Sequence, residues 1–226
     1  MRKHVIVVAG GAGTRLGGAL PKQFQMLRER PLLWWSLKAF HDEDPSAQLH
    51  LVLPKQFFSL WKELEAELPE SDRIIHSLHP GGASRFESVQ SALNAIAEEE
   101  SLVAVHDAAR PLVSREVIEA GWETAAEKGA GVPVVAVTDS LRRLDGDSSH
   151  AVDRSLYVAV QTPQVFQTRL LKEAYKRAEG NSFTDDASVV EANGVVPSLF
   201  KGSHTNIKVT NPGDLEIATL LLPPLS

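Results

Sequence analysis

A glycine-rich loop followed by two cations is the part of this sequence best suited to chemistry. The apolar run 5–9 predicts a buried strand. Four glycines come within the next eight residues, namely Gly10, Gly11, Gly13 and Gly17. Such a loop can turn sharply and bring its backbone N–H groups close to a phosphate. Arg15 and Lys22 add the positive charge that stabilises a triphosphate under attack, so the segment predicts a triphosphate site.

Two common phosphate-binding motifs do not match this loop. A P-loop requires Lys and then Ser or Thr after its last glycine, whereas Ala19 and Leu20 come after Gly18 here. The dinucleotide-binding fingerprint requires a third glycine at the position of Leu16. An ordinary glycine-rich turn between a strand and a helix stays an alternative.

A second candidate site comes after the predicted strand 74–78. Ligands of α/β proteins bind beyond the carboxyl ends of strands, and here the chain reads His-Pro-Gly-Gly-Ala-Ser-Arg-Phe-Glu-Ser over residues 79–88. The paired glycines and the hydroxyls could contact a base or a phosphate. A strand-to-helix turn with a capping box of Ser84 and Glu87 is an equally good interpretation.

Asp107 is the third candidate, because it stands directly after the apolar run 102–106. One carboxylate at the same edge as a phosphate loop is a usual way to hold Mg²⁺, and Arg110 could bind a phosphate. A capping Asp with an exposed Arg is the structural alternative. His106 is expected to pack rather than to bind a metal, since no second His or Cys lies at metal-ligand spacing.

The C-terminal half carries four weaker signals. They are Val152-Asp153-Arg154, Gln161-Thr162-Pro163-Gln164, Phe183-Thr184-Asp185-Asp186 with Ser188, and residues 206–210. Turns and helix starts of this composition are usually structural. Lys208 alternates with Ile207 and Val209 in a strand-like run, so its side chain is expected on the opposite face, where a lysine is commonly just exposed to solvent.

Composition limits the class of protein. The chain has 226 residues with 43% hydrophobic content, which suits one α/β domain over residues 1–226. Its net charge of −6 argues against nucleic acid or an anionic membrane as the main partner. The absence of cysteine and the shortness of the apolar runs lead us to expect a cytoplasmic protein.

The hydrophobic pattern predicts a mostly parallel, twisted sheet with helices on both faces. Strands are predicted at residues 5–9, 49–53, 74–78, 102–106, 132–137, 158–161 and 195–200. Helices are predicted at residues 32–41, 55–68, 85–98, 115–128, 169–178 and 213–222. Residues 138–157 break this rhythm and predict a protruding β-hairpin about Asp145-Gly146-Asp147 that packs on a partner subunit. A long mobile loop is the alternative.

Seven motifs in this order make the chain resemble the 2-C-methyl-D-erythritol 4-phosphate cytidylyltransferase family. They are A-G-G-x-G-T-R-L with P-K-Q, G-G-x-x-R-x-x-S, H-D-A-A-R-P, V-D-R, Q-T-P-Q, T-D-D-A-S and N-I-K-V-T. They span nearly the whole chain. The resemblance implies a Rossmann-like nucleotidyltransferase fold and the transfer of CMP from CTP to methylerythritol 4-phosphate in the nonmevalonate isoprenoid route. It also implies Mg²⁺ dependence and a homodimer.

The resemblance further implies roles for individual residues. CTP would be held by Ala9, Gly10, Gly11, Gly13 and Thr14, with Gly82 and Ser88 at the cytosine. The catalytic cations would be Arg15 and Lys22 at the α-phosphate, and Arg154 and Lys208 at the acceptor. Asp107 would hold the Mg²⁺ ion. The substrate pocket would be lined by Asp107, Ala108, Arg110, Ser140, Thr162 and Thr184, and the arm with Ser140 and Arg154 would reach into the partner's site.

Two positions depart from the family pattern. Ser140 stands where Thr is expected and keeps the hydroxyl. Thr205 stands where an acidic residue often precedes Asn-Ile-Lys, which puts a second carboxylate there in doubt.

Three other functions share some of these features. A ribitol-5-phosphate cytidylyltransferase shares the loop and the Lys22 position. The Ala108-Ala109 pair, Asp153 before Arg154 and the Thr-Asp-Asp-Ala-Ser run at 184–188 favour methylerythritol. A catalytically inactive, nucleotide-sensing relative would not need cations that act only on the transition state. An NAD-dependent oxidoreductase would need an acidic residue after the second strand, where Leu53-Pro54-Lys55 stands.

Overall fold

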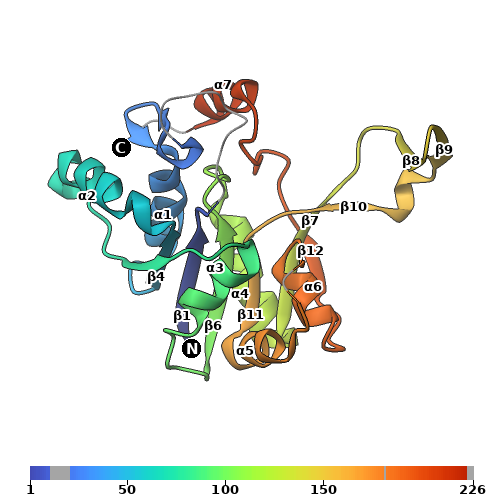
Figure 1. Cartoon of the computed structure of the whole chain (residues 1–226), viewed down its shortest axis with the longest axis horizontal. Helices are drawn as coiled ribbons and strands as arrows, with labels where there is room; N and C mark the ends of the chain where they lie inside the picture. The colour runs from blue at the N-terminus through green and yellow to red at the C-terminus, as the bar shows by residue number, and fades with distance from the viewer. Residues whose placement is uncertain (11–20, 181, 223–226) are drawn as a thin grey trace.

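A computed structural model describes residues 1–10, 21–180 and 182–222 of the protein. Its centre is an eight-stranded sheet with the strand order β10-β7-β11-β6-β1-β4-β5, and β12 also pairs with β7 (Figure 1). The strands are β1 (Arg2–Val8), β4 (Gln48–Leu53), β5 (Ser77–Pro80), β6 (Ser101–Asp107), β7 (Ala130–Ala136), β10 (Val158–Val160), β11 (Gln164–Gln167) and β12 (Ser198–Lys201).

The strands that build the functional edge are parallel. β1 pairs in parallel with both β4 and β6, and β4 pairs in parallel with β5. β11 is antiparallel to β6 and β7, and β10 is antiparallel to β7. Because the carboxyl ends of β1, β4, β5 and β6 meet at one edge, the loops after them lie together. The predicted fold class is confirmed.

Helices cover both faces of the sheet. The α-helices are α1 (Leu32–Glu43), α2 (Phe58–Glu67), α3 (Arg85–Leu93), α4 (Arg115–Lys128), α5 (Thr168–Arg177), α6 (Asp186–Glu191) and α7 (Pro212–Leu221). The 3₁₀ turns are η2 (Lys22–Phe24), η3 (Lys55–Phe57), η4 (Glu70–Asp72) and η5 (Arg154–Leu156), and β2 (Met26–Leu27) pairs with β3 (Arg30–Pro31). Among the described residues, no helix combines the length and the apolar character that a membrane crossing requires.

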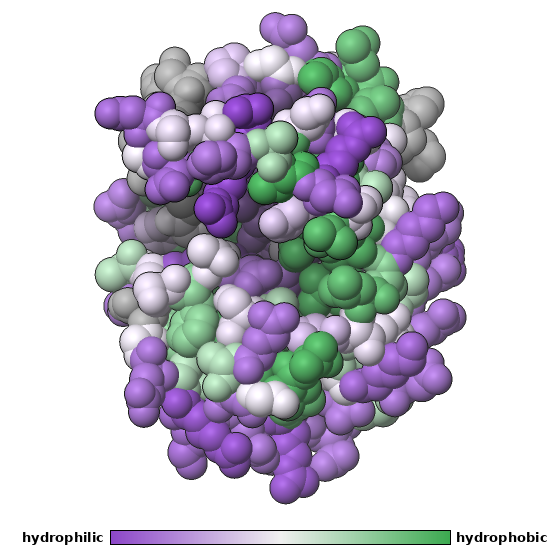
Figure 2. All heavy atoms as spheres, turned by 90° about the vertical axis from the view of Figure 1, so that its right-hand side faces the viewer, coloured by the Kyte–Doolittle hydropathy of each residue, from purple (hydrophilic) through white to green (hydrophobic). Residues whose placement is uncertain are grey.

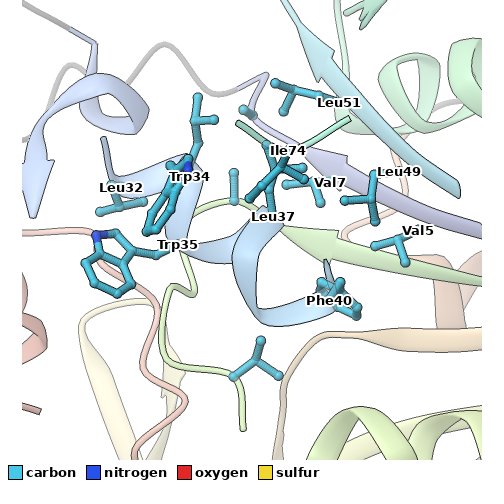
Figure 3. Close-up of a cluster of buried hydrophobic side chains, with 14 of the residues drawn as sticks. Val5, Val7, Leu32, Trp34, Trp35, Leu37, Phe40, Leu49, Leu51 and Ile74 are labelled. Atoms are coloured by element: carbon cyan, nitrogen blue, oxygen red, sulfur yellow. The ribbon is translucent and has the colours of Figure 1, made fainter. Parts of the chain in front are cut away.

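The alternation of side chains along β1 divides the core into two clusters. Val5 and Val7 pack with α1, α2, α4 and α7, and Figure 3 shows the Trp34 and Phe40 side chains of this cluster. Ile6 and Val8 point to the other face and pack with α3, α5 and α6. Since successive side chains of a strand point to opposite faces, the apolar residues 5–8 of β1 can serve both layers.

The arm forms the predicted hairpin. β8 (Leu141–Asp145) pairs antiparallel with β9 (Ser148–Val152), so Gly146 and Asp147 make a two-residue turn. Gly146 has a φ of 58°, a backbone conformation that favours glycine. Figure 1 shows the arm extending away from the sheet beyond β7 and β10. A mobile loop without secondary structure is therefore the wrong alternative for residues 141–152.

Several predicted boundaries are wrong. The strand predicted at 74–78 is β5 at Ser77–Pro80, because the register with β4 starts at Ser77 while Ile75 is 94% exposed. The helix predicted at 85–98 ends at Leu93, since the N–H groups of Ala95 and Ile96 bond to carbonyls three residues earlier. The strand predicted at 195–200 is β12 at Ser198–Lys201. The strand-like run 206–210 is not a strand, and β11 and α6 were not predicted.

Three histidines form a hydrogen-bonded row across β1, β4 and β5. His4 Nδ1 lies 3.3 Å from His50 Nε2, and His50 Nδ1 lies 3.0 Å from His79 Nε2. His4 and His50 are buried. Burial lowers the pKa of all three rings, and that of His50 falls to about 4. The row is therefore neutral near pH 7.

We expect the free energy of unfolding to fall as the pH drops from 6.5 to 4. The unfolded chain binds a proton at His50 near the ordinary pKa of 6.5, whereas the folded chain resists it down to about 4. At about 1.4 kcal/mol for each pKa unit, the loss from His50 is roughly 3 kcal/mol. Urea unfolding at a series of pH values should show a weaker pH dependence for His50→Gln than for the wild type. His150→Gln on the exposed arm should behave as the wild type, and equal slopes for His50→Gln and wild type would contradict this origin of the acid sensitivity.

Candidate active site

The loops after β1 and β5 meet at the side chain of Ser88. The Ser88 hydroxyl donates to the carbonyl of Ser84 at 2.9 Å and accepts from the N–H of Gly82 at 3.1 Å. A Cβ atom at Gly10 would lie 3.2 Å from Ser88 Oγ, so glycine lets the two loops approach closely. The structure thus brings together Gly10, Gly82 and Ser88, three of the residues predicted to hold the nucleotide.

Two more backbone contacts tie this edge to the sheet. The N–H of Ala9 donates to the carbonyl of Val52, and the N–H of Ala108 donates to the carbonyl of Val8. Ala9 and Ala108 are buried at these strand ends. The predicted nucleotide residues Gly11, Gly13 and Thr14 and the predicted catalytic Arg15 lie outside the described residues.

Lys22 begins the 3₁₀ turn η2 beside the end of β1. The turn is anchored by the buried Gln23, whose Nε2 donates to the carbonyl of Ala9 at 3.1 Å. The hydrogen bond from the backbone N–H of Thr210 lowers the pKa of the Asp214 carboxyl in the first turn of α7. The charge of Lys22 lowers this pKa further, so Lys22 lies near Asp214. Lys22 therefore stands between the end of β1 and the start of α7.

Asp107 lies between two cations at the end of β6. Its Oδ1 is 3.3 Å from Arg85 Nε, and its Oδ2 is 2.7 Å from Lys208 Nζ. Burial alone would raise the pKa of the Asp107 carboxyl, but the charges of Arg85 and Lys208 outweigh burial and hold it well below its ordinary value. Asp107 is therefore ionised at every physiological pH. The Lys208 side chain is 45% exposed and can change partner.

Thr162 fixes the backbone of Asp107 from the loop that precedes β11. The N–H of Asp107 donates to Thr162 Oγ1 at 3.0 Å. His106 Nε2 donates to the carbonyl of Arg110, so the neutral ring accepts from the Thr162 hydroxyl at Nδ1, 3.2 Å away. Burial lowers the pKa of His106 to about 4, which keeps the ring neutral. His106 is thus a packed residue, as expected, and Thr162 already has donor and acceptor partners within the protein.

Arg110 and Asn206 hold the segment that carries Lys208. Arg110 Nη1 donates to the carbonyl of Asn206 at 2.7 Å, and burial lowers the pKa of its guanidinium. The Asn206 amide, fully buried, donates to the carbonyl of Thr162 at 2.9 Å. The N–H of Val209 donates to the carbonyl of Ala109. These bonds, rather than a sheet ladder, place the Lys208 side chain at Asp107.

Arg85 and Asp186 belong to the same cluster, and neither received a role from the sequence. Arg85 Nη2 lies 2.7 Å from Asp186 Oδ2, and Asp186 is fully buried. The sequence showed only a helix start at each position. The available signal was that Arg85 is the Arg of the motif G-G-x-x-R-x-x-S and Asp186 is the second Asp of T-D-D-A-S.

Three predicted residues, Ser140, Arg154 and Thr184, are exposed at the surface. Ser140 and Arg154 are exposed on the arm, and the Arg154 guanidinium donates to the carbonyl of Thr138 within the arm. Thr184 is exposed just before Asp185, which caps α6 by accepting from the N–H of Ser188 at 3.0 Å. Within one described chain, the site therefore combines Gly10, Gly82, Ser88, Asp107 and Lys208, and it is supported by Arg110 and Thr162.

Comparisons with known proteins place this arrangement in a family. The family model of IspD, 2-C-methyl-D-erythritol 4-phosphate cytidylyltransferase, matches residues 3–223. The protein of that name from Phocaeicola vulgatus is 46% identical over 222 residues, covering 98% of this chain and 100% of the relative. The one from Clostridium perfringens strain SM101 is 38% identical over 218 residues, covering 94% of this chain and 95% of the relative.

Solved structures agree with the sequence comparison. The crystal structure of 2-C-methyl-D-erythritol 4-phosphate cytidylyltransferase from Thermus thermophilus matches with a TM-score of 0.79 at 37% identity, covering 98% of each chain. The Francisella tularensis enzyme of the same name matches with a TM-score of 0.79 at 28% identity, covering 98% of this chain and 100% of that one. The resemblance seen in the motifs is confirmed, and the chain belongs to the 2-C-methyl-D-erythritol 4-phosphate cytidylyltransferase family.

Proposed function

We propose that this chain transfers CMP from CTP to 2-C-methyl-D-erythritol 4-phosphate in the synthesis of isoprenoid precursors. The products are 4-diphosphocytidyl-2-C-methyl-D-erythritol and pyrophosphate. The observation that carries the proposal is the meeting of Asp107, Arg85 and Lys208 at the sheet edge that also holds Gly10, Gly82 and Ser88. This edge offers backbone and hydroxyl groups for a nucleotide beside cations for phosphates.

The reaction needs positioning and charge rather than a strong base. A phosphate oxygen of the acceptor attacks the α-phosphorus of CTP, a new P–O bond forms, and the bond to the β-phosphate oxygen breaks as pyrophosphate leaves. The acceptor phosphate is already ionised, so no proton has to be removed. In the proposed mechanism Lys22 and Arg15 stabilise charge at the α-phosphate, and Lys208 with Arg154 orients the acceptor phosphate.

We further propose that Mg²⁺ assists this step. Among the described residues, His, Cys, Asp and Glu side chains form no group of three that could hold a metal. Asp107 instead suits the mode in which Mg²⁺ takes one or two protein carboxylates and completes its shell with phosphate oxygens and water. When bound, the ion neutralises charge on the phosphates. Asp107 is ionised at the sheet edge, as such a ligand must be.

A homodimer is also part of the proposal, in which the arm completes the partner's site. Leu144 and Leu156 on the arm are 79% and 78% exposed, and Tyr157, Val158 and Val160 beside it are exposed as well. Figure 2 views the molecule from the arm's side and shows hydrophobic side chains gathered among hydrophilic ones. Apolar surface of this kind on an edge strand favours burial against a second copy. The cytoplasm remains the predicted location.

Pyrophosphate release distinguishes this function from its alternatives. With CTP and Mg²⁺, we expect methylerythritol 4-phosphate to give a kcat/KM about a hundredfold or more above that of ribitol 5-phosphate. EDTA should abolish turnover, and excess Mg²⁺ should restore it. A preference for ribitol 5-phosphate would support the other cytidylyltransferase. CTP binding by calorimetry without turnover of either acceptor would support the nucleotide-sensing alternative.

A further inference from the structure

Arg85 joins two carboxylates that lie far apart in the chain. It is the first residue of α3 and stands after the loop that carries Gly82. Its Nε faces Asp107 Oδ1 at 3.3 Å, and its Nη2 faces Asp186 Oδ2 at 2.7 Å. Arg presents its donors in a rigid planar fork, so one guanidinium can orient two acceptors at once. Both carboxylates therefore keep a fixed geometry relative to the start of α3.

The Asp186 end of this bridge is anchored in the core. Asp186 is fully buried and accepts from the hydroxyl of Tyr175 at 2.7 Å. Its backbone N–H donates to the Gln164 side chain at 3.0 Å. The Tyr175 ring stacks on Phe86, the residue next to Arg85, with 4.5 Å between ring centroids. The guanidinium is thus held from the core side, and Asp107 lies at its other end.

The Asp107 end of the bridge lies beside Lys208, the cation proposed to orient the acceptor phosphate. With Oδ1 on Arg85, the second oxygen of Asp107 points to Lys208. Arg85 is held at its other end by Asp186, whereas Lys208 is 45% exposed on a flexible side chain. Oδ1 is therefore held in place by Arg85. Oδ2 can lose its contact with Lys208 and bind a ligand in its place.

We propose that Arg85 is a positioning residue for the cytidylyl transfer. It fixes the orientation of the Asp107 carboxylate and links the loop with Gly82 to the loop with Thr184. No substrate contact is needed for this role. The inference rests on the proposed function for its kinetic consequence, while the bridge itself can be tested without turnover.

A double variant separates positioning from charge neutralisation. Arg85→Met alone leaves the buried Asp186 without its cation and is expected to destabilise the fold. Asp186→Asn removes that charge, and once Arg85 is replaced by Met its carbonyl oxygen can keep the hydrogen bond from Tyr175 without facing a second donor. We therefore compare Asp186→Asn with Arg85→Met/Asp186→Asn, and we add Arg85→Lys, which keeps the charge but cannot bridge both carboxylates as a fork.

We expect the double variant, which removes both charges of the buried pair, to keep a urea midpoint near that of the wild type, and the two single variants to stay folded. Asp186→Asn should retain kcat within about threefold, because Arg85 still contacts Asp107. The double variant should lose about tenfold or more in kcat, with a smaller change in the KM for CTP, since a misplaced carboxylate impairs the reaction more than nucleotide binding. Arg85→Lys should also have a kcat below that of the wild type, because lysine cannot contact both carboxylates as a fork. Wild-type kcat in the double variant, or in Arg85→Lys, would overturn the proposal.

Amide hydrogen exchange supplies a readout that does not depend on activity. In the double variant, peptides spanning 107–110 and 182–188 should exchange faster than in Asp186→Asn, while the α4 peptide 115–128 should not change. Unchanged exchange in both loops would also overturn the proposal. If the wild type releases no pyrophosphate with either acceptor, the proposed function fails, and the exchange comparison still decides whether Arg85 holds the two loops.

Discussion

Replacing Lys22 with alanine should lower kcat for pyrophosphate release by about a hundredfold or more, while CTP binding weakens less. A cation held in place before the reaction stabilises charge that develops only as the acceptor attacks. The anchoring of η2 through Gln23 to the end of β1 gives Lys22 such a fixed base. The measurement is kcat from steady-state pyrophosphate release, with the Kd of CTP from calorimetry.

The chain contains its own matched control for this substitution. The tetrapeptide Pro-Lys-Gln-Phe occurs at residues 21–24 and again at 54–57, and both copies form a 3₁₀ turn that starts at the lysine. Lys55 is exposed after β4 and has no part in the proposed mechanism. Lys55→Ala should therefore keep kcat within about twofold, as for most surface substitutions.

The pair of variants makes the assignment easy to contradict. Equal losses in Lys22→Ala and Lys55→Ala would point to a general effect on the protein. Unchanged kcat in Lys22→Ala would show that this cation does not act on the transition state. Arg15→Ala is predicted to behave like Lys22→Ala, and its position lies outside the described residues.

Elements with a strong hydrophobic period could be predicted from the sequence. The helix predicted at 115–128 matches α4, because its apolar residues recur on one face and Gly129 ends it with a φ of 87°. The short strand β11 could not be predicted in this way. It has four residues with a Gln at each end, and its ladder partners on β6 lie about sixty residues earlier in the chain.

In the candidate site, too, local sequence pattern identified some residues, whereas others depend on contacts between distant parts of the chain. Asp107 and Gly82 were identified because local pattern shows where a strand ends and which residues come after it. The pairing of Arg85 with Asp186 spans 101 positions and appears only when α3, α5 and α6 pack together. Lys208 was predicted to lie on a strand, yet its position depends on the bonds that Arg110 and Asn206 make to the irregular segment around it.

A mixture of two inactive variants should regain activity if the arm serves the partner's site. Lys22→Ala is altered in the body of the subunit and Arg154→Ala in the arm, which extends away from that body (Figure 1). In a mixed dimer, the body of the Arg154→Ala chain pairs with the intact arm of the Lys22→Ala chain. One site then has both cations, and the other has neither.

The expected recovery is about a quarter of the wild-type activity. Random exchange makes half of the dimers mixed, and each mixed dimer has one working site out of two, as two-fold symmetry requires. Pyrophosphate release is measured after the two proteins have been incubated together, with subunit exchange monitored by native mass spectrometry. Each variant incubated alone should stay inactive.

A second pairing tests whether recovery depends on where each residue lies. Lys22→Ala mixed with Lys208→Ala should not recover, because both changes fall in the body of the subunit, and each site of a mixed dimer then lacks one cation. Recovery in this pair would mean that Lys208, rather than only the arm, crosses to the partner. The absence of recovery in the first pair, despite proven exchange, would mean that Arg154 serves the site of its own chain. The exposed Leu144 and Leu156 would then need another explanation than a shared active site.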